Sequence, residues 1–285
     1  MKNRFSRMNP QQLSEQLCNK GKLACGWYHG SWHLLKSLGV VSTSAVHEKS
    51  ITQLLKLALA QRSQAEILIT GSTDETLLSI IKKVADEIGC DVSVTAIDIC
   101  ATPLAFMEHY ANQYSLKLET CKTDIIDYKT EKRFDIILTH AFMGYFNHSS
   151  RILLVEKWQQ LISEDGCIVT IQRVRPETSE EVVSFDDEQS ENFVSRAIEI
   201  AKEKSITEPG QLKKIEKAAA IFSKKFKNYA INSREVLESL FNNSGLVFHT
   251  LEYHQVEPLG NLSGPSVPSN AEFAHIIAKK KGNLL

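Results

Sequence analysis

The sequence has almost no excess of charge of either sign. Its 285 residues include 33 lysines and arginines against 34 aspartates and glutamates, a formal net charge of -1. So small a net charge gives no whole-molecule field to attract nucleic acid or anionic lipid. No uninterrupted apolar run approaches the about 20 residues of a membrane helix, and the basic first residues lack the apolar segment of a secretory signal. We therefore expect a soluble, cytoplasmic protein that binds neither nucleic acid nor membranes.

Closely spaced cysteine pairs are missing as well. The six cysteines are scattered and include no Cys-x-x-Cys pair, so we expect reduced thiols. They are Cys18, Cys25, Cys90, Cys100, Cys121 and Cys167. His29 and His33 have the i, i+4 spacing that can hold a metal on a helix, but the sequence shows no nearby third ligand and no His-Glu-x-x-His pattern. We therefore expect no metal site.

A regular alternation of short apolar runs with amphipathic stretches begins at residue 65. Five of the runs have the length and the β-branched composition of strands. They span residues 66–70, 92–98, 116–120, 134–140 and 167–174. Apolar residues recur at helical spacing between them, as over 74–88 and 152–162, and a turn at 164–166 is expected ahead of the fifth strand. This order predicts βαβ units and a parallel sheet.

The alternation stops after Pro176. Residues from about 178 to 230 are strongly charged and helical in pattern, and so look like an insertion. The earlier pattern then returns, with Ser233 as a helix N-cap and Gly245 as the helix stop. Two apolar runs close the sequence, at 246–256 and 272–280, and their breaker-rich connection at 257–270 predicts an antiparallel pair. The whole pattern predicts an α/β fold: a three-layer doubly wound sheet, mostly parallel, with an antiparallel closing strand.

Two of the predicted strands end in residues suited to a ligand. Open α/β sheets bind their ligands at the carboxyl ends of the strands. The first strand is followed by Gly71, which allows a tight turn, and the second ends in Asp98, 27 residues later (98 minus 71). That offset is near the about 20 residues expected of an acid that binds ribose hydroxyls. The alternative is that Asp98 caps the helix that begins at Thr102.

These strand ends, together with the order of elements, resemble the class I S-adenosylmethionine-dependent methyltransferases. The segment ILITGSTDETL is similar to the family's glycine-rich first motif, with Gly71 at its leading position and Ser72 where a further glycine is usual. The segment after the second strand is similar to the Asp-x-x-x-Thr-Pro-Leu motif of a bacterial small-molecule group whose first motif is degenerate. The resemblance implies four residues that bind S-adenosylmethionine: Gly71, Ser72, Asp98 and Ile99.

A third motif follows the third strand. The segment CKTDIIDY is similar to the family's adenine-binding motif, which implies that Asp124 accepts a hydrogen bond from the exocyclic amine. It also implies that the N–H and side chain of Ile125 lie against the ring. Asp127 is the competing acid, and either acid suits a turn instead. The resemblance as a whole covers residues from about 60 to 176 and from 233 to 280.

The fourth strand ends in THAFMGYF, similar to the Thr-His-(Ala/Ser)-Phe-x-Gly-Tyr-Phe of the same bacterial group. The family places methyl-transfer residues here, which implies His140 as a cofactor contact and as a general base. The alternative is a buried histidine bonded to a carbonyl. The same segment implies Tyr145 as catalytic and Phe142 as substrate-binding, although core packing also explains aromatic residues. Near the end of the fifth strand, Arg173 is suited to hold an acidic group of the substrate.

Aromatic residues crowd into the segment ahead of the sheet. Amino-terminal helices often cover the cofactor in the methyltransferases that this chain resembles, and a sulfonium cation is attracted to a π face. We therefore predict a helical lid over residues 1–58, with Tyr28 and Trp32 against the cofactor and Trp27 against the substrate, ahead of a cofactor-binding domain over 59–285. One alternative is that the tryptophans only pin this arm to the core. The charged insertion fits a wall of the site, a contact of a homodimer or a solvated helical pair.

These features predict an enzyme that transfers a methyl group from S-adenosylmethionine to a small-molecule acceptor by in-line displacement, leaving S-adenosylhomocysteine. Two alternatives stay open. An NAD-dependent dehydrogenase shares the ribose-binding acid, although the Gly-x-Gly-x-x-Gly pattern is missing. A non-catalytic scaffold or partner subunit that binds S-adenosylmethionine is the other.

Overall fold

The computed structural model describes residues 10–21, 24–176, 178, 181–255, 264–265 and 271–282. The chain divides into two compact units. Among the described residues, those within 1–43, 182–228 and 255–271 form the helical unit, and those within 44–181, 229–254 and 272–285 form the sheet unit. This division differs from the predicted boundary between residues 58 and 59, because helix α3 (Glu48–Leu59) packs on strands of the sheet. No helix within the described ranges is long and apolar enough to cross a membrane.

The sheet unit is built on a seven-stranded sheet in the order β3-β2-β1-β4-β5-β9-β8. Its strands are β1 (Gln64–Thr70), β2 (Asp91–Asp98), β3 (Lys117–Lys122), β4 (Phe134–His140), β5 (Ile162–Val174), β8 (Leu246–Gln255) and β9 (Glu272–Lys280). The first five strands pair in parallel, and β9 runs antiparallel to β5. The predicted sheet is therefore confirmed, while the connection at 257–270 lies mostly outside the described residues.

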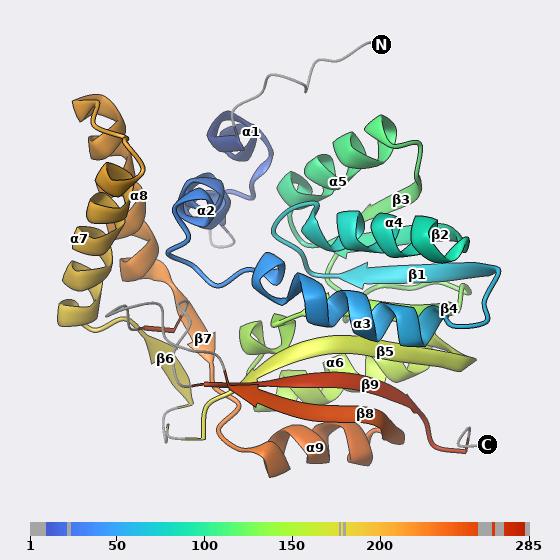
Figure 1. Ribbon diagram of the computed structural model, residues 1–285. Coiled ribbons are helices and arrows are strands. Elements are labelled where there is room, and N and C mark those ends of the chain that lie inside the picture. Colours follow the sequence, from blue (N-terminus) through green and yellow to red (C-terminus); the bar gives the residue numbers. More distant parts are fainter. Residues whose placement is uncertain are drawn as a thin grey trace. The chain divides into compact units, whose positions relative to one another are not determined.

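Helices cover both faces of this sheet (Figure 1). On one face α3 packs beside α4 (Thr76–Ile88), and on the other α6 (His148–Leu161) packs beside α9 (Arg234–Asn243). Successive side chains of a strand point to opposite faces, which supplies apolar surface to both layers. Leu68 of β1 and Ile137 of β4, for example, share a core cluster with Trp158 of α6. The three-layer arrangement is thus confirmed.

Local signals set several element ends. Ser233 caps α9 as predicted, and Gly245, with a φ of 74°, follows the end of that helix. The predicted turn at 164–166 is wrong, because these residues lie inside β5, where its register with β4 shifts. Gly166 suits this irregularity, since a Cβ there would lie 2.7 Å from the carbonyl oxygen of Phe134.

The helical unit contains the amino-terminal arm and the insertion. Its elements are α1 (Pro10–Leu17), α2 (Gly26–Leu38), α7 (Asp187–Glu203), α8 (Pro209–Lys225) and most of a short two-stranded sheet, β6 (Val182–Ser184) and β7 (Lys227–Tyr229). Trp32 of α2, Phe193 of α7 and Phe222 of α8 belong to one buried cluster. The amino-terminal arm and the insertion, which lie far apart in the sequence, therefore share a core.

Candidate active site

The first loop at the carboxyl edge of the sheet turns at Gly71, directly after β1. Its φ is +66°, and a Cβ built on it would lie 2.2 Å from ring atoms of Phe142. Glycine is thus required twice, by the left-handed backbone and by the close approach of the aromatic ring. The predicted turn glycine and the predicted substrate residue Phe142 are therefore in contact.

Asp98 ends β2 and joins two loops through its carboxylate. Its Oδ2 accepts a hydrogen bond from the Ser72 N–H at 3.3 Å, and its Oδ1 accepts one from the Cys100 N–H at 2.8 Å. Helix α5 (Ala101–Gln113) is capped by the Cys100 side chain, so the alternative of Asp98 as its cap is wrong. The neighbouring Ile99 is 49% exposed. A fixed carboxylate and an accessible apolar side chain therefore stand together at this strand end.

The predicted adenine loop follows β3 as a tight turn. The Asp124 Oδ1 accepts a hydrogen bond from the Ile126 N–H at 2.9 Å, and the Asp124 carbonyl accepts one from the Asp127 N–H at 3.1 Å. Asp124 therefore has the turn role weighed from the sequence, and it is exposed. Ile125 is only 3% exposed and belongs to the core cluster. The buried Ile125 side chain is therefore not available to an adenine ring, and only the backbone N–H of Ile125 is left for the predicted contact.

His140, the predicted base, ends β4 beside a second histidine. Its Nε2 lies 2.9 Å from Nδ1 of His47, the last residue of the 3-10 helix η2 (Ser44–His47). The two residues are 93 positions apart in sequence, and no motif connects them, so sequence reasoning missed His47. Its one signal is its place directly ahead of the amphipathic helix α3.

The strand register places a third histidine on the same face of the sheet. His140 pairs with Ile171 of β5, which in turn pairs with His275 of β9. Residues that pair directly across strands point to the same face. The ring centroid of His47 lies 6.0 Å from that of His275 and 4.4 Å from that of Phe273. We call His47, His140 and His275 the histidine patch.

All three imidazoles of the histidine patch have lowered pKa values. The pKa of His140 falls to about 3, and those of His47 and His275 fall to about 4. The main cause is burial, which disfavours the charged imidazole, and the next is repulsion from a neighbouring histidine. The patch is therefore neutral at pH 7. Among the described residues, the buried Nε2 atoms of His47 and His275 have no hydrogen-bond partner.

Arg173 lies two residues beyond Ile171 on β5 and so faces the same side of the sheet. Its guanidinium carbon is 5.0 Å from the ring centroid of Phe273. The positive charge of Arg173 also contributes to the low pKa values of His47 and His140. The predicted substrate-binding cation is thus within electrostatic reach of the predicted base.

After His140 the chain turns sharply into the 3-10 helix η3 (Phe142–Tyr145). The turn passes through Ala141 in the left-handed region, with a φ of 50°. The ring centroid of Tyr145 lies 6.4 Å from that of Phe142, and Tyr145 is 47% exposed. The turn therefore brings Phe142 onto Gly71 and leaves the predicted catalytic tyrosine accessible.

The three predicted lid aromatics belong to the helical unit. Tyr28 stacks on Trp32 with ring centroids 5.2 Å apart and on Phe222 of α8 at 5.8 Å. Trp27 lies 6.1 Å from the same phenylalanine. These contacts pin the amino-terminal arm to the insertion. The contacts of Trp27, Tyr28 and Trp32 with cofactor or substrate stay predictions.

Known proteins resemble this chain in structure rather than in sequence. No protein-family model and no curated protein matches it. An S-adenosylmethionine-dependent methyltransferase from Clostridium acetobutylicum is 11% identical with a TM-score of 0.51, over 82% of this chain and 92% of that one. The N-methyltransferase NodS from Bradyrhizobium japonicum, in complex with S-adenosyl-L-homocysteine, is 13% identical with a TM-score of 0.50, over 86% of this chain and 98% of that one. The chain therefore has the class I methyltransferase fold that its sequence predicts.

Proposed function

We propose that the protein transfers the methyl group of S-adenosylmethionine to a small-molecule acceptor. The observation that best supports this function is the end of β2, where backbone N–H groups of two loops hold the Asp98 carboxylate. The residues there fit an adenosyl group. A carboxylate accepts hydrogen bonds from ribose hydroxyls, and the exposed Ile99 offers apolar surface to a base. The likeness of the fold to two methyltransferases supports the same function.

In this proposal the loops at the carboxyl edge of the sheet bind the cofactor. Asp98 binds the ribose, and Ile99 and the Ile125 N–H contact the adenine. Asp124 lies on an exposed turn. In the proposal its carboxylate accepts a hydrogen bond from the exocyclic amine of the adenine. When bound, S-adenosylmethionine supplies an electrophilic methyl group on a sulfonium cation. The turn at Gly71 positions the Ser72 N–H, which donates to the Asp98 carboxylate.

His140 is the proposed general base. Its low pKa keeps His140 neutral at pH 7, so one ring nitrogen keeps a lone pair for the proton of a hydroxyl, thiol or ammonium acceptor, but the same low pKa makes the imidazole a weak base. His47 holds the ring through the 2.9 Å contact between His47 Nδ1 and His140 Nε2, and so acts as a positioning residue. Arg173 would bind an acidic group of the acceptor. The six reduced cysteines favour the cytoplasm as the site of action.

Calorimetric titration with S-adenosylmethionine, S-adenosylhomocysteine and NAD tests the cofactor assignment. We expect both sulfur nucleosides to bind and Asp98→Ala to weaken that binding by about 10- to 100-fold, the value of one or more hydrogen bonds to a charged group. Asp91→Ala is the matched control, because Asp91 opens the same strand and is an exposed partner of Lys117. The control should bind normally.

Two outcomes of the titration would contradict the proposal. Tight binding of NAD alone would favour a dehydrogenase. Unchanged nucleoside binding by Asp98→Ala would remove the residue on which the assignment depends. Transfer of labelled methyl groups from the bound cofactor into a metabolite extract then separates an enzyme from a non-catalytic binding protein.

A further inference from the structure

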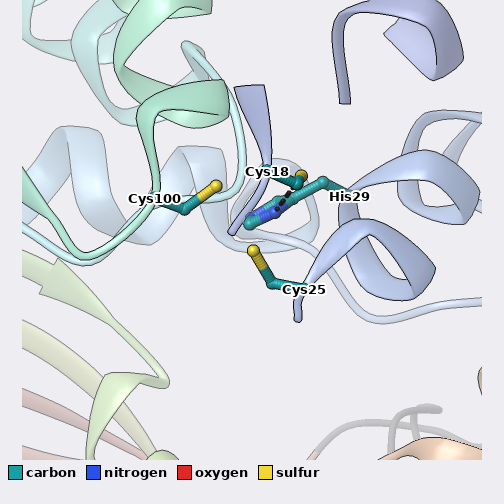
Figure 2. Close-up of side chains that lie close together, drawn as sticks. All are labelled: Cys18, Cys25, His29 and Cys100. Atoms are coloured by element: carbon teal, nitrogen blue, oxygen red, sulfur yellow. Dashed lines mark hydrogen bonds between the residues drawn. The ribbon is translucent and has the colours of Figure 1, made fainter. Parts of the chain in front are cut away.

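Two thiols and an imidazole converge where α1 meets α2 in the helical unit. Figure 2 shows the side chains of Cys18, Cys25 and His29 pointing toward one another. Cys18 directly follows α1, Cys25 is the N-cap of α2, and His29 lies four residues beyond Cys25. Because helix residues at i and i+4 share a face, Cys25 and His29 project to the same side. Cys100, also drawn, belongs to the sheet unit and is not counted here.

The distances within this cluster are close to those of a metal site. The Cys18 Sγ lies 3.4 Å from the His29 Nδ1, and the potential ligand atoms of all three residues lie within 4.8 Å of one another. Tetrahedral zinc with ordinary bond lengths places a sulfur and a nitrogen ligand about 3.6 Å apart and two sulfurs about 3.8 Å apart. Closing the cluster around an ion therefore needs side-chain movements of about 1 Å or less.

Burial and charge also suit a zinc ion. Cys18 is 4% and His29 7% exposed, and Cys25 is partly exposed. An uncompensated charge in such surroundings is costly, but a divalent ion with two thiolates carries no net charge. The Cys25 thiolate would also lie at the positive amino-terminal end of the 13-residue helix α2, which stabilises it. Soft sulfur ligands combined with imidazole select zinc over calcium or magnesium.

We propose that Cys18, Cys25 and His29 bind Zn²⁺ through two thiolates and one imidazole, with the fourth position taken by water or another ligand. The proposal does not depend on methyl transfer. The metal would fasten α1, which has only eight residues, to the start of α2. A helix that short is marginal without tertiary support. Without metal, the Cys18 thiol and the His29 imidazole are already in contact.

Cobalt titration of the full-length, reduced, metal-free protein tests the site. We expect one equivalent of Co²⁺ to produce thiolate-to-cobalt charge-transfer absorption and the intense visible bands of tetrahedral coordination, and zinc to displace it. Cys25→Ser should weaken the charge-transfer band, and Cys18→Ser with Cys25→Ser should abolish it. Cys121→Ser removes a partly buried thiol of β3 in the sheet unit and is the matched control. This variant should titrate like the parent protein.

X-ray absorption at the zinc edge of the parent protein keeps the test independent of how the variants fold. At least two sulfur ligands and one imidazole would support the site. A shell of nitrogen and oxygen only, or a cobalt spectrum that survives the double cysteine substitution, would overturn it. Failure of cofactor binding would leave both readouts unchanged, so the two proposals fail separately.

Discussion

Gly71 and Gly89 have almost the same backbone conformation but different surroundings. Their φ values are +66° and +73°, yet a Cβ at Gly71 would meet the Phe142 ring at 2.2 Å, whereas a Cβ at Gly89 would meet nothing within 4 Å. Gly89→Ala should therefore cost about 1–2 kcal/mol of unfolding free energy, the penalty of the left-handed conformation. Gly71→Ala should cost at least about 1 kcal/mol more, because the ring must move.

Urea unfolding of the two alanine variants measures this difference, and calorimetry with S-adenosylmethionine shows whether the first loop still binds. Because Phe142→Ala removes the clash but also a ring packed against the core, the double variant Gly71→Ala with Phe142→Ala should lose less stability than the sum of the two single losses. Equal losses of unfolding free energy in Gly71→Ala and Gly89→Ala would mean that the Phe142 ring moves aside at no energetic cost.

The roles of His140 and His47 can be separated by substitutions with amides. Each amide places a polar group where one imidazole nitrogen lies in the parent protein. In His140→Gln the amide reaches the place of Nε2, and in His47→Asn it reaches the place of Nδ1, so their contact can persist without an imidazole. General bases contribute about 10²- to 10⁴-fold, and a base with a pKa as low as that of His140 belongs at the lower end of this range. His140→Gln should therefore lower the transfer of labelled methyl groups into an extract by about 100-fold while cofactor binding persists. His47→Asn should lower it less. Full activity of His140→Gln would exclude a base at this position.

At the scale of elements, one buried arginine holds the turn that carries Phe142. Arg151 of α6 is 2% exposed. Its Nε donates to the Met143 carbonyl at 2.9 Å, and its two terminal nitrogens donate to the carbonyls of Ala230 and Tyr229 at 2.8 and 2.6 Å. Burial lowers its pKa to about 10, so it stays charged at pH 7.

Arg151→Lys should lose about 2–4 kcal/mol of unfolding free energy, because an ammonium on a flexible stem cannot reproduce the planar fork. Arg133→Lys is the control, since the exposed Arg133 donates to the carbonyls of its neighbours Glu131 and Lys132. It should change stability by less than about 0.5 kcal/mol. Amide hydrogen exchange over residues 142–146 should also become faster in Arg151→Lys but not in Arg133→Lys. Unchanged exchange in Arg151→Lys would mean that Arg151 does not hold this turn.

Predictions from sequence succeeded where a local signal decides an element. Strand periodicity, the Ser233 cap and the Gly245 stop are properties of a few adjacent residues, and all three agree with the structure. The predicted turn at 164–166 was wrong, because these residues form an irregular stretch inside β5, between the pairs Phe134–Ile162 and Ile136–Cys167, and their polar composition does not distinguish such a stretch from a turn. Asp98 was predicted as a binding residue from its place at a strand end, and that role stays a prediction. His47 was not predicted, since only tertiary structure brings it to His140.

At the scale of the whole molecule, sequence periodicity revealed the sheet but not the division into units. The amino-terminal arm and the charged insertion each have a helical pattern that also fits a solvated helix. Only their shared aromatic core, with Trp32 against Phe222, shows that they fold as one unit. That information lies in packing between distant segments, which composition and spacing do not report.

Acid should destabilise the sheet unit through the histidine patch. The folded-state pKa values of about 3 to 4 lie below the ordinary 6.5, so the unfolded chain binds protons first as the pH falls. The stability is complete above about pH 6.5 and is lost as the pH falls toward about 4, by up to about 1.4 kcal/mol per pH unit for each histidine. Between pH 7 and 5 each histidine should remove about 2 kcal/mol.

His275→Leu tests this linkage because the substitution replaces one titrating group with an apolar one. Urea unfolding at pH 7 and pH 5 should show a pH dependence smaller than that of the parent by about 2 kcal/mol. The same pH dependence in both proteins would mean that His275 does not titrate on unfolding.

The helical unit is built from segments that lie far apart in the sequence, which delays its folding during translation. Its core joins α2, which ends at Leu38, to α7, which begins at Asp187. At ribosomal speeds of about 5–20 residues per second, roughly 7 to 30 seconds pass between the emergence of these two helices. Throughout that interval the indole of Trp32 has Tyr28 of its own helix beside it but lacks Phe222 and the rest of the core that α7 and α8 contribute. The newborn chain should therefore be a client of chaperones that bind apolar segments until translation has passed α8.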